Sequence, residues 1–175
     1  VKTELKRQSP PKPMDLPSLQ KKAGSWGWTA KKVLDTAQSL YETHKITTYP
    51  RAETRYLPET FIDQAGQLLK SLKTLEPFQR YSLKEPIIRK GKSGVFSDTA
   101  LEGVSHHAII PNINTADQFS KIYPQLAEDE KRLFNLIAQS YLAAIGIDHE
   151  YNRTEISFDV AVNDSIKKFS KAGSV

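Results

Sequence analysis

The sequence predicts an α+β fold that is mainly helical, with three principal helices and a few short strands. Three segments, around residues 29–44, 58–72 and 127–145, carry apolar residues at the i, i+3, i+4 spacing of one helix face. Residues 154–162 instead alternate apolar and polar side chains, as a strand with one buried face does. A length of 175 residues suits one domain with a single core.

The first 17 residues contain four prolines and few large apolar side chains, which argues against a helix there. We expect residues 1–20 to be an extended linker or strand that connects to a neighbouring domain. The main domain is then expected over residues 21–150. The sequence begins at Val1 and not at a methionine, so we expect it to be an internal piece of a longer protein.

The first principal helix is predicted to begin after Thr29, a residue type that caps helix N-termini. Its apolar face consists of Ala30, Val33, Leu34, Ala37, Leu40 and Tyr41. The helix is expected to end near residue 44, before the β-branched residues 46–48. Because Pro50 disfavours helical backbone in the residue before it, Tyr49 is expected on an extended or turning segment.

The second helix can begin at Pro58, since proline is tolerated in the first turn of a helix. Its apolar stripe is Phe61, Ala65, Leu68, Leu69 and Leu72. Residues 84–105 show no steady period and predict a long, partly mobile basic loop. Gly91-Lys92-Ser93 within it is not a phosphate-binding P-loop, because Pro86 occupies the position of the required first glycine.

The third helix is predicted over residues 127–145, with Gly146 beyond its end. Its inward side chains are Phe134, Ile137, Ala138, Tyr141 and Ile145. The strand at 154–162 needs a partner, either from outside this sequence or from the extended N-terminal segment. We expect residues 151–175 to return as a strand to the neighbouring domain.

Composition and charge restrict the function. There are no cysteines, which excludes disulfides and thiolate zinc sites and fits a cytoplasmic protein, and neither a signal peptide nor a membrane-spanning apolar run is visible. Residues 1–58 hold 11 Lys/Arg against 5 Asp/Glu, whereas residues 59–175 hold 14 against 15. The excess positive charge therefore lies in the first third of the chain, where it would attract a phosphate polyanion or form an ordinary solvated surface.

Tyr49 is the candidate nucleophile. A phenol with a pKa near ~10 is a poor nucleophile unless nearby positive charge or a base stabilises its anion. Arg51, two residues along an extended segment, is expected on the same face and can hold a phosphate by two hydrogen bonds. The alternative is that Tyr49 packs its ring on the core, as tyrosines commonly do.

Two separate stretches carry a family resemblance. The first contains Leu40-Tyr41-Glu42, Thr48-Tyr49-Pro50-Arg51, Glu53 and Arg55-Tyr56-Leu57-Pro58, and the second is Ser105-His106-His107-Ala108-Ile109-Ile110-Pro111-Asn112. Together they resemble the motifs of the type IA DNA topoisomerases, of the topoisomerase III branch, and a weaker likeness extends from about Leu16 to Val162. Ala52 departs from the pattern, since a serine or threonine is usual there, and we expect the missing hydroxyl to remove a hydrogen bond near the phosphate.

The resemblance implies the chemistry of an ATP-independent isomerase. Tyr49 would attack a phosphodiester of single-stranded DNA and remain joined to the 5′ phosphate, with Arg51 clamping that phosphate and His106 orienting the strand. Thr48, Arg55, Lys45 and His107 are the further residues expected to bind DNA. The fold implied is a tyrosine-bearing gate domain that swings to let a second strand pass, connected to a missing neighbouring domain.

The family also implies magnesium, bound by an acidic domain that this sequence lacks. Glu128-Asp129-Glu130 do not replace it, because consecutive helical side chains point about 100° apart. We therefore expect no metal bound by this chain, which should bind DNA but cut it poorly alone. The expected partners are single-stranded DNA and the remaining domains of the same enzyme, with no membrane, in a monomeric, nucleoid-associated bacterial protein.

Other functions remain open. A non-catalytic single-strand binding module could stack bases on Trp26, Trp28, Tyr49 and Tyr56. A relaxase-like tyrosine nuclease needs a His-x-His metal site, and the adjacent His106 and His107 would point to opposite faces of a strand. The dispersed Arg and His residues of a tyrosine recombinase have no matching arrangement here.

Overall fold

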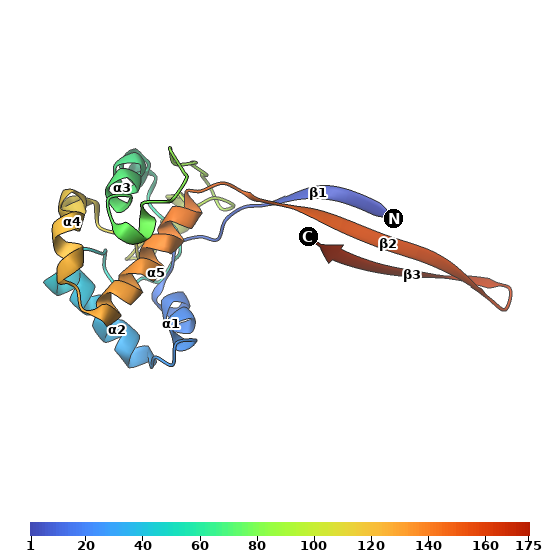
Figure 1. The fold of residues 1–175 in the computed structure, drawn as a ribbon, viewed down its shortest axis with the longest axis horizontal. Helices are drawn as coiled ribbons and strands as arrows, with labels where there is room; N and C mark the ends of the chain where they lie inside the picture. Colours follow the sequence, from blue (N-terminus) through green and yellow to red (C-terminus); the bar gives the residue numbers. More distant parts are fainter. The chain divides into compact units, whose positions relative to one another are not determined.

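The computed structural model describes residues 1–175, which separate into two compact units. The first unit combines the two ends of the chain, Val1–Pro10 and Ile147–Val175, and the second is Pro11–Gly146 (Figure 1). The chain therefore passes from one unit to the other twice, after residue 10 and after residue 146. That the two ends connect to a further domain stays a prediction.

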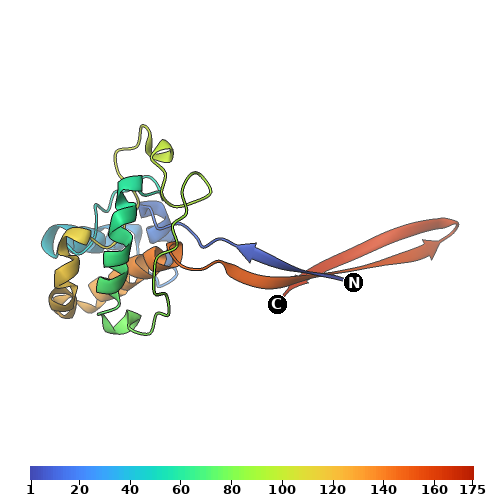
Figure 2. The ribbon, with the colours of Figure 1, turned by 90° about the horizontal axis from the view of Figure 1, so that it is seen from above.

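The first unit is a three-stranded antiparallel sheet. Its strands are β1 (Lys2–Gln8), β2 (His149–Val162) and β3 (Ser165–Ser174), in the order β1-β2-β3 that Figure 1 shows. Figure 2 gives the same strands seen from above. The pairing of β1 with β2 confirms the N-terminal segment as one of the two partners considered for the strand at 154–162. β3 was not predicted. The turn between β2 and β3 has only two residues, Asn163 and Asp164, both with positive φ, as tight hairpin turns require.

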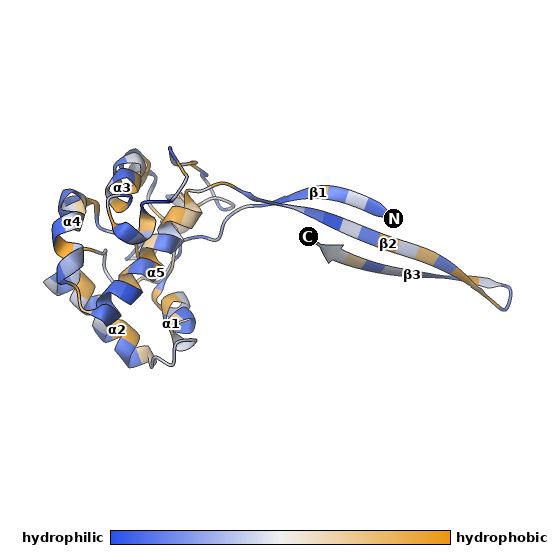
Figure 3. Ribbon diagram, viewed as in Figure 1, coloured by the Kyte–Doolittle hydropathy of each residue, from blue (hydrophilic) through white to orange (hydrophobic).

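One face of this sheet is apolar and exposed. Ile156, Phe158, Val160 and Val162 alternate along β2 and so share a face, and all four are exposed. Figure 3 shows hydrophobic colour in the part of β2 near the turn to β3. Phe169 lies opposite Phe158 across the strands, with the two rings stacked at 5.6 Å. These exposed rings form a surface that water solvates poorly.

The second unit contains all the α-helices. They are α1 (Leu16–Gly24), α2 (Ala30–Gln38), α3 (Ala65–Leu72), α4 (Phe119–Ile122) and α5 (Glu128–Ala144). Short 3₁₀ segments lie at Glu59–Gln64, Glu76–Phe78, Thr99–Leu101, Ile113–Gln118 and Tyr123–Gln125, and one π-helical turn at Ser39–Thr43. The α+β class is thus confirmed, and α2, α3 and α5 are the three principal helices predicted. All five residues expected to face inward from α5 are buried.

The expectation of extended chain up to residue 20 is wrong for residues 16–20, which lie in α1. Asp15 caps this helix by accepting a hydrogen bond from the Ser18 amide at 2.9 Å. Pro17 falls in the first turn, where a helix needs no amide donor from that residue. The proline that suggested extended chain is therefore compatible with a helix start.

Residues 84–105 are irregular, as predicted, except for the 3₁₀ turn at Thr99–Leu101. The middle of the segment nevertheless belongs to the core: Phe96 is fully buried, and Leu57 exchanges backbone hydrogen bonds with Val95 (2.9 Å) and Ser97 (3.0 Å). No helix of the chain is both long enough and apolar enough to span a membrane.

Candidate functional site

The chain that leads to Tyr49 leaves its helix through two unusual backbone turns. α2 continues as a π-helical turn, Ser39–Thr43, and Lys45 then adopts φ 53°, a left-handed conformation that is uncommon for a residue other than glycine. Two side chains hold this turn by donating to the Lys45 carbonyl oxygen: Asn112 at 3.0 Å and Thr115 at 2.7 Å. Lys45 itself is exposed and makes no ion pair.

Residues 46–48 then pair with residues 110–112, which belong to the second motif. The amide of Asn112 donates to Ile46 (2.9 Å), and the amide of Thr48 donates to Ile110 (2.9 Å). The Thr48 hydroxyl accepts from the Ile110 amide at 3.0 Å and lies 3.4 Å from the Ala108 carbonyl, to which it can donate. These bonds join the two motifs that carry the family resemblance and fix the backbone on which Tyr49 stands.

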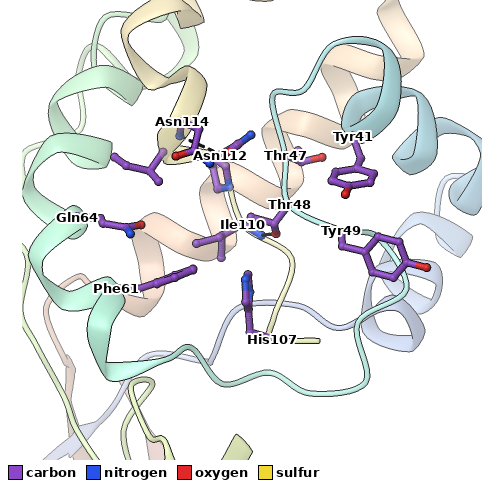
Figure 4. A pocket seen from close by; sticks show the side chains of 12 residues that line it. Tyr41, Thr47, Thr48, Tyr49, Phe61, Gln64, His107, Ile110, Asn112 and Asn114 are labelled. Carbon is purple, nitrogen blue, oxygen red and sulfur yellow. Dashed lines mark hydrogen bonds between the residues drawn. The ribbon is translucent and has the colours of Figure 1, made fainter. Parts of the chain in front are cut away.

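Tyr49 lies between two other rings on the surface of the unit. Its ring centre is 5.5 Å from that of Tyr41, edge to face, and 4.2 Å from that of His106, tilted by 38°. Tyr49 is half-buried and does not belong to the hydrophobic core, and its hydroxyl makes no hydrogen bond. Figure 4 shows this hydroxyl pointing away from Thr48 and Ile110.

The residues that follow Tyr49 alternate between buried and exposed. Pro50 and Ala52 are buried, whereas Arg51 is exposed and makes no hydrogen bond or ion pair. Because Ala52 is only 3% exposed and packs in the core, a hydroxyl at this position would face the interior of the unit. That a hydroxyl at position 52 would lie near the phosphate stays a prediction.

Two other residues predicted to bind DNA are engaged within the unit. Arg55 donates from Nε to the Pro13 carbonyl (2.7 Å) and from an Nη to the Lys12 carbonyl (2.6 Å), and so holds the N-terminal segment against the motif. The Nδ1 atom of His107 lies 2.8 Å from the Ala108 carbonyl, and its ring packs edge to face on Phe61 at 4.8 Å. Burial lowers the pKa of His107, which favours the neutral imidazole at pH 7.

A pocket of about 300 Å³ lies beside Tyr49. Its walls are formed by Tyr41, Thr47, Thr48, Tyr49, Phe61, Gln64, His107, Ile110, Pro111, Asn112, Ile113 and Asn114 (Figure 4). The Oε1 atom of Gln64 is buried and has no hydrogen-bond partner. Gln64 and Phe61 were not among the predicted site residues, because only folding brings the 3₁₀ segment Glu59–Gln64 next to the two motifs.

The acidic residues at the start of α5 do not form a metal site. Glu128 pairs with Lys131 at 3.0 Å, and Asp129 pairs with Lys32 at 2.7 Å. Glu130 accepts hydrogen bonds from the Ser39 hydroxyl (2.6 Å) and the Ala127 amide (2.9 Å) and lies 3.0 Å from His44. The residues present therefore do not fit magnesium, and no cluster of three or more His, Cys, Asp or Glu side chains is arranged to hold a metal ion.

The two tryptophans considered for base stacking are covered by cations. The Lys32 ammonium lies 4.4 Å from the ring centre of Trp28, and the Arg132 guanidinium lies 4.2 Å from that of Trp26. The two indoles also contact each other edge to face at 5.3 Å. These contacts leave less ring surface for a stacked base than the sequence suggested.

The fold and the site together define a mainly helical tyrosine-bearing module whose two motifs are joined by backbone hydrogen bonds. All 175 residues match a family model described as DNA topoisomerase. The DNA topoisomerase 3 of Haemophilus influenzae is 34% identical over 157 residues, and that of Salmonella typhimurium is 31% identical over 163. The chain belongs to the type IA DNA topoisomerases and is homologous to topoisomerase III.

The match covers most of this chain but a minor part of each relative. It spans 89% of this chain and 23% of the Haemophilus influenzae protein, and 92% and 23% for the Salmonella typhimurium protein. Full-length topoisomerase I from Thermotoga maritima has the same fold over 99% of this chain and 27% of its own, with a TM-score of 0.60 at 22% identity. The chain thus spans about a quarter of the length of these proteins.

Proposed function

We propose that this chain is the part of a type IA topoisomerase that carries the nucleophile, and that Tyr49 forms a transient 5′-phosphotyrosyl link with single-stranded DNA. The Tyr49 oxygen bonds to the phosphorus as the bond from phosphorus to the 3′ oxygen breaks. The phenolic proton is lost, and the 3′ oxygen leaves as a hydroxyl. Reversal of the same exchange reseals the strand without ATP.

The observation that carries this proposal is the setting of Tyr49. An ordinary core tyrosine buries its ring and bonds its hydroxyl, whereas Tyr49 lies outside the core with an unbonded hydroxyl. Its backbone is fixed by the pairing with residues 110–112, so the phenol is presented on a rigid support. Its position within the first motif, which resembles that of the family, supports the same role.

Arg51 and His106 are the groups proposed to act with Tyr49. Arg51 is exposed and unpaired, so its guanidinium is available to hold the scissile phosphate and stabilise the phenolate. The His106 ring lies against the Tyr49 ring at 4.2 Å, close enough to contact a strand bound at the hydroxyl. Lys45, exposed on the turn that precedes Tyr49, would contact a neighbouring phosphate.

Thr48, Arg55 and His107 would support the site more than they bind phosphate. The polar groups of Thr48 and Arg55 form hydrogen bonds with backbone groups, and the lowered pKa of His107 disfavours a cationic ring. We keep the predicted contact with DNA only for polar atoms that have no partner within the unit, such as the Nε2 atom of His107. We assign Thr48 and Arg55 to positioning of the segment that bears Tyr49.

The remaining domains of the enzyme are the proposed protein partner. The exposed apolar face of the sheet, with Phe158 at 57% and Phe169 at 48% exposure, supports contact with further protein. The two chain crossings between the units also suit a lobe that moves as a gate. The family resemblance implies magnesium held by a separate acidic domain.

The first experiment measures binding and covalent attachment with a 3′-labelled single-stranded oligonucleotide. A native gel reports binding by this chain, and we expect a shift that weakens as salt rises. Covalent chemistry is tested in a chimera in which this chain replaces the matching segment of the Haemophilus influenzae topoisomerase 3. A denaturing gel should then show a labelled adduct with Tyr49 and none with Tyr49→Phe.

A non-catalytic single-strand binding module is the second candidate, favoured by the excess positive charge of residues 1–58. It predicts the same native shift. The two functions separate in the chimera, since binding alone gives no adduct.

A further inference from the structure

We propose that the pocket beside Tyr49 binds one unstacked nucleobase of the DNA strand, with the side-chain amide of Gln64 as its hydrogen-bonding partner. This inference rests on the proposed function and deepens it. It assigns to the site a means of holding the strand by a base as well as by its phosphates.

The walls of the pocket suit a flat, neutral ring. Phe61 and His107 supply aromatic surface, Ile110 and Ile113 supply apolar surface, and no lining residue carries a charged Asp, Glu, Lys or Arg side chain. Aromatic side chains bind the faces and edges of unstacked bases with little dependence on sequence. A volume of about 300 Å³ lies at the small end of ligand pockets, as expected for a single base and not for a longer segment.

The distribution of charge also favours a base inside the pocket and phosphates outside it. Lys45 and Arg51, exposed on either side of Tyr49 in the sequence, offer cations to phosphates. The lining of the pocket offers none. A phosphate would therefore lose solvation without gaining a counter-ion if it entered the pocket, whereas a base would lose little.

Gln64 supplies the polar partner. Its Oε1 atom has no hydrogen-bond partner and almost no accessible surface, which is costly in a folded protein. A turn of the side chain into the pocket would let a base supply the missing donor. The amide of Asn112, by contrast, is already used: Nδ2 donates to Lys45 and Oδ1 accepts from the Asn114 amide. A glutamine amide offers an acceptor beside a donor, the pair that matches the edge of a base such as adenine.

His107 adds a second acceptor of fixed tautomer. The lowered pKa favours the neutral ring, and the Ala108 carbonyl 2.8 Å from Nδ1 requires the proton to be on Nδ1. The Nε2 atom is then an acceptor. Together with Gln64 Oε1, it favours a base that presents an amino group over one that presents only carbonyl oxygens.

The pocket shares Tyr49 with the cleavage site. The Tyr49 ring lines the pocket, while its hydroxyl points away from the other lining residues (Figure 4). A base in the pocket and a phosphate at the hydroxyl would therefore belong to the same short stretch of strand, within one or two nucleotides. Such a base would help to set which phosphate meets the nucleophile.

Gln64→Met tests the inference, because methionine keeps the length of the side chain and removes both polar atoms. Without a ligand, the substitution should raise Tm, since it removes an unsatisfied buried acceptor. Affinity for a short oligonucleotide that contains adenine or cytosine should nevertheless fall, by roughly 3- to 10-fold, the loss of one neutral hydrogen bond. Gln67→Met, exposed on α3, is the matched control and should change neither quantity.

A residue with a purely structural role would not show these opposite signs. Unchanged affinity in Gln64→Met, with wild-type DNA binding intact, would overturn the pocket and leave the proposed function standing. Absence of binding by the wild-type chain even at low salt would overturn the proposed function itself, and the pocket with it.

The second measurement locates the base directly. A five-nucleotide strand carrying 5-iodocytosine, which presents an amino group, at one position at a time is irradiated with the chain, and the crosslinked peptide is identified by mass spectrometry. Crosslinks to Phe61 or His107 from one or two adjacent positions support the proposal. Crosslinks confined to other peptides contradict it.

Discussion

Thr48→Val should destabilise the helical unit, because the Thr48 hydroxyl stands in for a backbone acceptor. The Ile110 amide donates to this hydroxyl at 3.0 Å, and Ile110 is only 2% exposed, so water cannot replace the lost partner. An unsatisfied buried amide costs about 1–3 kcal/mol. At about 4 °C per kcal/mol for a unit of this size, Tm should fall by roughly 4–12 °C.

The assay is thermal unfolding followed by circular dichroism, with urea unfolding as a second measure of stability. Thr48→Ser keeps the hydroxyl and should recover most of the loss. Thr60→Val, at an exposed position without a side-chain hydrogen bond, is the matched control and should leave Tm unchanged within about 1 °C. A Thr48→Val protein that melts with the wild type would refute the reasoning, since the Ile110 amide would then have another partner.

Three further predictions concern charged and titrating groups. Arg51→Ala should weaken single-strand binding and reduce the slope of log affinity against log salt by about 0.7, the value for one phosphate contact, without changing Tm. Arg55→Ala should instead lower Tm, because two hydrogen bonds to backbone carbonyls are lost; gel shifts across salt and thermal melts separate the two variants. Burial opposes the ionisation of Glu130, but hydrogen bonds from Ser39 and the Ala127 amide lower its pKa overall. The stability that Glu130 adds relative to Glu130→Gln should therefore be full above pH 4.5 and shrink below it. An equal loss of stability in Glu130→Gln at all pH values would contradict this. Burial is the main cause that lowers the pKa of His107. Stability should therefore fall as the pH drops below 6.5, because the unfolded chain binds the proton before the folded chain does. His107→Gln should not show this fall in thermal melts between pH 7 and pH 5.

The helical part of the fold was predictable wherever the apolar period was long. The stripe of α5 and the capping residue Thr29 of α2 place two helices within a few residues of their observed ends. α1 was missed because its nine residues contain a proline and few large apolar side chains, so its cap at Asp15 was the only strong signal. β3 was missed because Lys167 and Lys168 interrupt its alternation.

The predicted site residues are brought together in part. Tyr49 and His106 are in ring contact, although they are 57 positions apart in the sequence, and Thr48 joins the two motifs. Sequence spacing could not reveal that Arg55 donates its hydrogen bonds to backbone carbonyls, because these belong to residues more than 40 positions earlier. Nor could it reveal the unpaired Gln64, since burial without a partner is a property of packing.

The most direct test of the account is covalent trapping on a 3′-labelled single strand, in the chimera that contains this chain. We expect a labelled protein band with the wild-type sequence, a peptide adduct at Tyr49 by mass spectrometry, and no band with Tyr49→Phe. An adduct that persists in Tyr49→Phe, or that maps to another tyrosine such as Tyr41 or Tyr56, would contradict the assignment of Tyr49 as the nucleophile.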